Sequence, residues 1–83
     1  MGEVILVFKI IPESMDKFGD LKKKLEEMKP DRLEEEDVAF GLKAFKFTKI
    51  VPDEEGGLSK LEEELNAIPE VQSCENVAMS KSL

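Results

Sequence analysis

Residues 10–12 read Ile-Ile-Pro, and residues 50–52, forty positions later, read Ile-Val-Pro. Behind each of these runs the same spacing of apolar residues recurs, first over 18–28 and then over 58–68. The matching positions are Phe18 with Leu58, Leu21 with Leu61, Leu25 with Leu65, and Met28 with Ile68. The chain therefore contains two copies of an extended apolar run, an acidic turn and an amphipathic helix that a proline stops.

Two copies are too few for a solenoid, which needs at least about three repeats to bury its faces. Each copy is followed by one more strand-like segment, so the order is strand, helix, strand, twice over. With right-handed crossovers, this βαββαβ order predicts an α+β, ferredoxin-like split βαβ sandwich. We expect a four-stranded antiparallel sheet with strands 4–11 and 42–51 in its centre and both helices on one face. Residues 1–83 are expected to form a single domain.

Local signals predict the other element boundaries. The first helix is expected over 16–29, and a Ser-x-x-Glu capping box at 59–62 is expected to start the second. Segment 32–40 carries four consecutive acids and suits an exposed edge strand, because charge there prevents edge-to-edge aggregation. The fourth strand is expected over 71–79, which leaves 80–83 as a short tail.

The composition excludes most catalytic and metal sites. With no histidine and one cysteine, Cys74, the chain offers no Ser-His-Asp triad, no Cys-His pair and no histidine-ligated metal. The acidic run at 34–37 is a poor metal cluster, because consecutive strand residues point to opposite faces. The acidic loop at 52–57 lacks the ligand pattern of a calcium loop. We therefore expect neither an enzyme nor a bound metal or cofactor.

Charge and hydropathy bear on partners and location. The net charge of -7 and the pI near 4.6 repel phosphate backbones, which argues against direct nucleic-acid binding. No apolar run approaches the ~18 residues of a membrane span, and a single cysteine favours a reducing compartment. The sequence thus predicts a cytoplasmic protein without membrane or nucleic-acid contacts, and we expect it to be a monomer.

Two stretches are candidate functional sites. The first is Ala-Phe-Gly-Leu-Lys-Ala-Phe at 39–45, and the second is Ala-Met-Ser-Lys at 78–81.

Three rival functions share this fold. An RNA-recognition module would need stacking aromatics on the exposed sheet face, where Leu42 and Ala44 stand instead. An acylphosphatase-like enzyme would need an anion-binding loop after the first strand, but 12–15 is acidic and lacks glycine and arginine. A small-ligand regulatory domain stays open.

Three segments resemble the archaeal elongation factor 1-beta family: Gly-Glu-Val at 2–4, Ala-Phe-Gly-Leu-Lys at 39–43, and Val-Pro-Asp-Glu-Glu-Gly-Gly at 51–57. The resemblance covers essentially the whole length. It implies a guanine-nucleotide exchange factor for the GTPase elongation factor 1-alpha.

The same resemblance implies roles for particular residues. In eukaryotic relatives a near-terminal lysine enters the GTPase near its magnesium and phosphate site, and a phenylalanine before a glycine fills a pocket on the GTPase. The matching positions here are Lys81 and Phe40. Gly41 and Lys43 belong to the same Phe-Gly-Leu-Lys motif and are expected to be further partner-binding residues.

Overall fold

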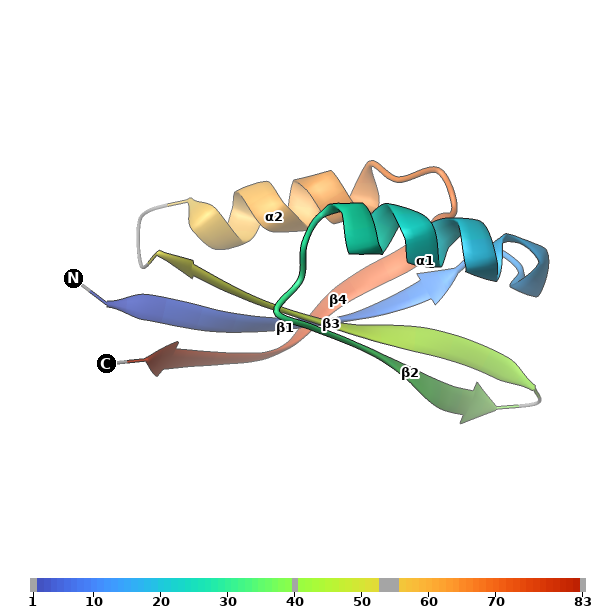
Figure 1. Cartoon of the computed structure of the whole chain (residues 1–83), viewed down its shortest axis with the longest axis horizontal. Coiled ribbons are helices and arrows are strands. Elements are labelled where there is room, and N and C mark those ends of the chain that lie inside the picture. Colours follow the sequence, from blue (N-terminus) through green and yellow to red (C-terminus); the bar gives the residue numbers. More distant parts are fainter. Residues whose placement is uncertain (1, 40, 53–55, 83) are drawn as a thin grey trace.

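The computed structural model describes residues 2–39, 41–52 and 56–82. Its elements follow the predicted order, with one short 3-10 helix added before the first α-helix (Figure 1). They are β1 (Glu3–Pro12), η1 (Met15–Lys17), α1 (Phe18–Glu27), β2 (Arg32–Ala39), β3 (Leu42–Pro52), α2 (Gly57–Asn66) and β4 (Val71–Ser82). The sheet order is β2-β3-β1-β4, and every neighbouring pair is antiparallel. The predicted ferredoxin-like α+β fold, with its first and third strands in the centre, is confirmed.

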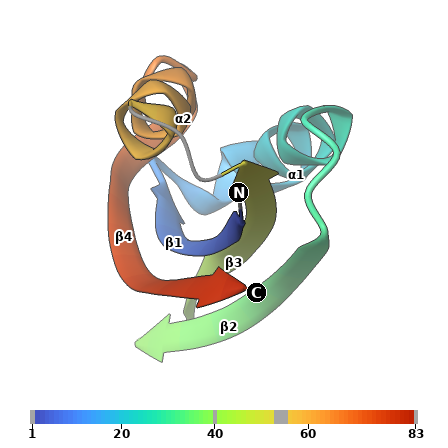
Figure 2. The same cartoon turned by 90° about the vertical axis from the view of Figure 1, so that its left-hand side faces the viewer.

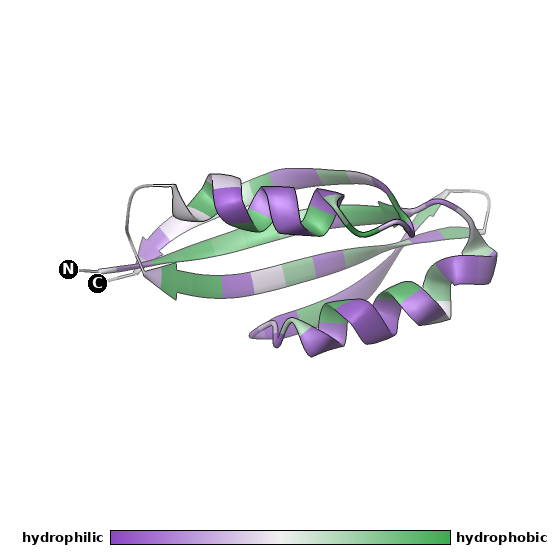
Figure 3. Cartoon of the chain, turned by 90° about the horizontal axis from the view of Figure 1, so that it is seen from above, coloured by the Kyte–Doolittle hydropathy of each residue, from purple (hydrophilic) through white to green (hydrophobic). Residues whose placement is uncertain are grey.

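Both helices cover one face of the sheet, which is visible when the molecule is viewed from its end (Figure 2). Hydrophobic and hydrophilic residues alternate along the strands and helices, so that each element buries one side (Figure 3). The resulting core is formed by Val4, Leu6, Phe8, Ile10, Leu21, Leu25, Phe45, Phe47, Leu61 and Leu65. Burying each large apolar side chain contributes roughly 1.5–3 kcal/mol, and this layer holds the helices on the sheet.

The opposite face of the sheet, here called the open face, is covered by neither of the two described α-helices (Figure 2). On β1, Ile5 and Val7 point to this face and are half-buried. Lys9 on β1 and Glu36 on β2 form an ion pair of 3.9 Å across it. The pair spans β3 above Ala44, the cross-strand partner of Glu36, and Ala44 is fully buried there. The open face is thus covered only by its own side chains.

Two side chains fasten the turn after α1 to β3. The ammonium of Lys49 donates hydrogen bonds to the carbonyl oxygens of Met28 and Lys29, at 3.2 and 3.0 Å. A cation at this position satisfies carbonyls that the helix end leaves without partners. The carboxylate of Asp31 accepts a hydrogen bond of 2.7 Å from the amide of Ile50. The chain therefore enters β2 in a fixed register against β3.

Helix α2 begins earlier than the sequence suggests. Gly56 precedes it in the left-handed conformation, at φ 84°, and its carbonyl accepts the hydrogen bond of Lys60 N at 2.9 Å. This turn starts the helix at Gly57, so the N-cap is Gly56, which makes no side-chain capping hydrogen bond, and Ser59 lies inside the first turn. The predicted capping box is wrong because the glycine turn ends two residues before it.

An ion pair secures the turn between α2 and β4. Glu70 is only 7% exposed, and the ammonium of Lys24 on α1 donates to its carboxylate at 2.6 Å. The backbone carbonyl of Glu70 accepts a further hydrogen bond of 2.8 Å from the amide of Glu13. The hydrogen bond from Lys24 lowers the pKa of the Glu70 carboxyl. Glu70 therefore joins α1, the end of β1 and the start of β4.

Candidate partner-binding site

The first candidate segment lies at the tight turn between β2 and β3. Ala39 pairs with Leu42, and Gly41 has a φ of 79°, a left-handed conformation that favours glycine. This conformation lets the chain turn back directly into β3. Phe40, the predicted anchor for a partner, lies outside the described residues. Its neighbours nevertheless place the segment at the end of the sheet that we call the hairpin end.

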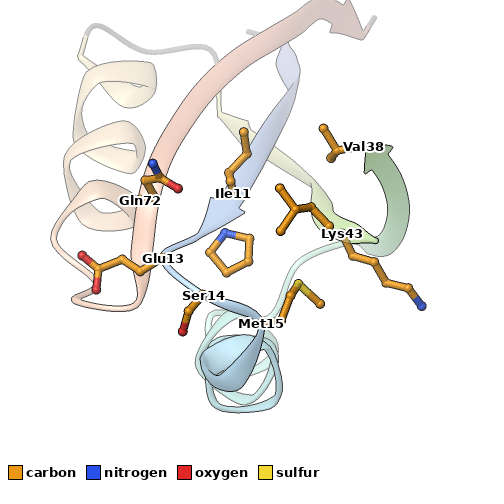
Figure 4. A pocket seen from close by; sticks show the side chains of 9 residues that line it. Ile11, Glu13, Ser14, Met15, Val38, Lys43 and Gln72 are labelled. Carbon is orange, nitrogen blue, oxygen red and sulfur yellow. The ribbon is translucent and has the colours of Figure 1, made fainter. Parts of the chain in front are cut away.

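An apolar groove of about 360 Å³ lies at the hairpin end (Figure 4). It is bounded by the last residues of β1, by η1, and by the strands on either side of the hairpin. Its lining consists of Ile11, Pro12, Glu13, Ser14, Met15, Val38, Leu42, Lys43 and Gln72. A volume of this size is within the range of about 300–1,000 Å³ that is typical of binding pockets.

Several apolar side chains that are exposed to water lie together in this groove. Six large hydrophobic residues are exposed in the described part of the chain, and Met15, Val38 and Leu42 among them all line this groove. Leu42 is 49% exposed and Val38 is 40% exposed. Exposed apolar residues that gather in one concave place indicate a contact surface more strongly than scattered ones do.

Lys43 stands at the edge of this groove and is exposed. It pairs across the strands with Asp37, and its side chain extends away from the apolar lining in Figure 4. The structure thus brings Gly41 and Lys43 to the same end of the molecule as the groove. A cation at the rim of an apolar surface acts mainly on orientation and association rate.

Lys81 is part of a strand rather than of a tail. β4 continues to Ser82, and the last pairs with β1 are Val4 with Lys81 and Glu3 with Ser82. The predicted tail at 80–83 is therefore wrong as far as residue 82, because β1 begins early enough to give these residues backbone partners. Lys81 is exposed and lies on the helix-covered side of the sheet, opposite Val4.

Met79 lies two residues before Lys81 on the same side of the sheet, opposite Leu6. It is 57% exposed, more than any other large hydrophobic residue that the structure describes. It borders a small notch of about 90 Å³ between the first residues of β1, the end of β3 and the start of α2. An apolar side chain and a cation thus project together beside the chain termini, at what we call the terminal end.

The two predicted site segments do not form one site. The hairpin end and the terminal end lie at opposite ends of the domain (Figure 1), whose longest extent is 41 Å. A partner that touches both ends must therefore span the length of the domain.

Outside these two segments, the side chains that the structure describes do not form a catalytic or metal centre. No group of three or more His, Cys, Asp or Glu in the described ranges could hold a metal ion. Cys74 on β4 is half-buried, and burial, with the nearby charge of Glu62, raises the pKa of its thiol to about 12. This thiol stays protonated at neutral pH, so it is a poor nucleophile.

The sheet does not match an RNA-recognition surface. Phe45 and Phe47 are fully buried and point to the helices, since they pair with Ile10 and Phe8 of the core. Among residues 2–39, 41–52 and 56–82, the open face carries no aromatic side chain on which a base could stack. In the same described part, no helix is long and apolar enough to cross a membrane.

Sequence reasoning missed the groove and Met79. The groove combines η1, β2 and β3, and its members have no common spacing in the sequence. Met79 stood in the Ala-Met-Ser-Lys stretch, but only the register of β4 shows that it shares a face with Lys81. The signal that could have found it is the pattern Val-Ala-Met at 77–79, which repeats Val-Ala-Phe at 38–40.

Comparison with known proteins gives the family of this fold and site. The EF-1 guanine nucleotide exchange domain matches residues 5–81. Elongation factor 1-beta of Methanococcoides burtonii is 44% identical over 81 residues, which cover 90% of this chain and 91% of that protein. The elongation factor 1-beta of Methanoregula boonei is 39% identical, covering 96% of this chain and 98% of its own length. The elongation factor 1-beta of Haloarcula marismortui is 40% identical over 88% of this chain and 90% of that protein.

These matches extend over nearly the whole chain and include both candidate segments. The chain therefore belongs to the EF-1 guanine nucleotide exchange domain family, and the resemblance found in its sequence is confirmed.

Proposed function

We propose that this protein promotes the exchange of GDP for GTP on the GTPase elongation factor 1-alpha, with Lys81 acting near the magnesium and phosphate site of that GTPase. The observation that carries this proposal is the family match over residues 5–81, together with an exposed Lys81 at one end of the domain. Lys81 is held by strand pairing rather than by a loop. Its four-carbon stem can therefore extend from a rigid base into a cleft of the partner.

The mechanism follows from how GTPases hold their nucleotide. Backbone amides, a lysine and Mg²⁺ together bind the phosphates of GDP. The ammonium of Lys81, brought to the cation site, competes with Mg²⁺ by charge and by volume and so weakens GDP binding. Linkage requires reciprocity, which means that GDP also weakens the binding of this protein.

No covalent bond is made or broken in this scheme. The protein would therefore act as a binding partner that accelerates release, and not as an enzyme. The hairpin end would supply part of the affinity, because its apolar groove and Phe40 offer the kind of contact that anchors interfaces. A monomer is sufficient for this action.

The test is the release of fluorescent GDP from elongation factor 1-alpha with the wild-type protein and with Lys81→Ala, across a series of Mg²⁺ concentrations. Wild-type protein should accelerate release, and raising Mg²⁺ should oppose it. Lys81→Ala should lower the rate at saturation by about 100-fold, an effect of the size that the loss of one preorganised hydrogen-bond donor has in enzyme active sites. It should also be less sensitive to Mg²⁺.

Two further variants sharpen this test. Lys23→Ala removes an exposed lysine of α1 and should leave release unchanged. Lys81→Arg should restore only part of the rate, because the planar guanidinium is wider than an ammonium. An unchanged release rate with saturating wild-type protein would rule out the proposed function. Parallel Mg²⁺ curves for wild type and Lys81→Ala would instead show that Lys81 acts away from the metal site.

A further inference from the structure

β4 contains one residue more than β1 where the two strands pair. Val7 pairs with Ala78 and Phe8 with Asn76, so Val77 has no partner and forms a β-bulge, with 49% of its surface exposed. The side-chain amide nitrogen of Asn76 donates hydrogen bonds to the carbonyl oxygens of Val7 and Ala78, both at 3.0 Å. Asn76 thus uses both of its amide hydrogens to hold the backbone on the two sides of the bulge.

The bulge decides to which side Lys81 points. Cross-strand partners share a face of the sheet, and a slip of one residue moves every following side chain to the other face. With the bulge, Lys81 stands opposite Val4, whose side chain points to the helices. If Val77 paired with Val7 instead, Lys81 would stand opposite Glu3 on the open face.

Packing alone specifies this register weakly. After the bulge, Ala78 and Ser80 face the open side and are small and exposed, and Met79 on the helix-covered side keeps 57% of its surface exposed. Small or polar strand ends are prone to slip, since neither register buries much more apolar surface. The two hydrogen bonds of Asn76 exist only in the bulged register and therefore favour it.

We propose that Asn76 is a positioning residue for nucleotide exchange, because it holds the bulge at Val77 and thereby directs Lys81 to the helix-covered face. This inference rests on the proposed function of Lys81. It assigns no contact with the partner to Asn76 itself. Its effect passes through the register of the last residues of β4.

Three variants distinguish a positioning role of Asn76 from a general contribution of this residue to stability. Asn76→Ala removes both hydrogen bonds and should let β4 slip. Deleting Val77 in the Asn76→Ala background removes the residue that makes a slip possible, and Lys81 then stays opposite Val4. The exchange Ser80→Lys with Lys81→Ser keeps length, charge and composition but moves the lysine to the open face.

The readouts are GDP release at saturating protein and cross-strand nuclear Overhauser contacts of residue 81. Asn76→Ala should lower release by about 10-fold or more, as a misplaced reactive group does, with contacts of residue 81 moving from Val4 to Glu3. The deletion of Val77 should restore both the release rate and the contact with Val4. The Ser80/Lys81 exchange should be as inactive as Lys81→Ala.

The proposal is overturned if Asn76→Ala keeps wild-type release, if deleting Val77 fails to restore it, or if the exchanged lysine works on the open face. Failure of the proposed function has a different signature. In that case wild-type protein does not accelerate release, or Lys81→Ala equals wild type, while the shift of the residue 81 contacts in Asn76→Ala still reports the register. Thermal unfolding of each variant identifies any that fails to fold.

Discussion

The two edge strands of the sheet carry nearly the same short sequence in different surroundings. β2 ends in Val-Ala at 38–39, which Phe40 follows in the sequence, and β4 carries Val-Ala-Met at 77–79, thirty-nine positions later. In both strands the valine is the extra residue of a bulge. Beyond it, the chain turns back at Gly41 in one case and runs on as a strand to Ser82 in the other.

This difference shows how one repeated unit can give two kinds of surface. At the hairpin end the returning strand supplies Leu42, which completes an apolar groove with residues of β1 and η1. At the terminal end β4 runs on to Ser82, so Met79 and Lys81 project from an extended edge. We therefore expect the affinity for the partner to depend on the hairpin end and the rate of GDP release on the terminal end.

The largest expected effect on affinity is that of Phe40→Ala. An aromatic anchor that fills a pocket on a partner contributes about 2 kcal/mol or more, which is roughly a 30-fold weaker dissociation constant. The concentration of protein that gives half-maximal GDP release should rise by this factor, while the rate at saturation should change little. Lys81→Ala should show the reverse pattern. If the two variants behave alike, the two ends do not have separate roles in affinity and release.

Thermal unfolding provides the control for Phe40→Ala. The fold should be retained, because ten buried residues of β1, β3 and the two α-helices already form a core. If the variant unfolds while its folded fraction keeps full affinity, Phe40 is a residue of the core.

A smaller effect is expected for Leu42→Asp in the groove. A carboxylate there would need to be desolvated when an apolar side chain of the partner enters, so binding should weaken by about 10-fold. Ile50→Asp is the matched control, since Ile50 lies on the same strand, is 39% exposed and points to the open face away from the groove. Equal losses for both variants would show that the groove has no special part in binding.

The sequence predicted the fold because several of its signals agree. The repeated apolar spacing, the prolines and the acidic run at 34–37 each indicate the same element order, and consistency of this kind specifies one structure. The boundaries that were wrong depend on backbone details. Because Gly56 is left-handed, α2 starts earlier than predicted. Because Glu3 and Val4 provide backbone partners, β4 continues beyond residue 79.

The candidate site was predictable only in part. Gly41, Lys43 and Lys81 could be named from short motifs, and the structure places the first two together and the third far from them. Met15 and Asn76 could not be named. Met15 lines the groove because of tertiary packing. Asn76 holds a bulge that no spacing in the sequence predicts.

The pH dependence of stability tests whether the hairpin end can unfold locally while the terminal end stays folded. The pKa of Glu70 is lowered by its hydrogen bond from Lys24, so the ionised carboxylate stabilises the fold. This contribution is fully present above the ordinary value of 4.5 and is lost as the pH falls through the lower pKa of the folded state. Glu70→Gln should therefore lower the urea midpoint at pH 7, and the difference from wild type should shrink below pH 4.5. Glu63→Gln, at an exposed position of α2, should give no comparable difference at either pH.

Hydrogen exchange locates where this loss acts. The amide of Glu13 donates to the carbonyl of Glu70 beside the groove, whereas the amides of β4 near Lys81 belong to the terminal end. In Glu70→Gln the protection of the Glu13 amide should fall first, while the protection near Lys81 should follow global unfolding only. Equal loss at both ends would show that the sheet responds as one unit. Loss confined to the hairpin end would show that affinity and release can be tuned separately in this family.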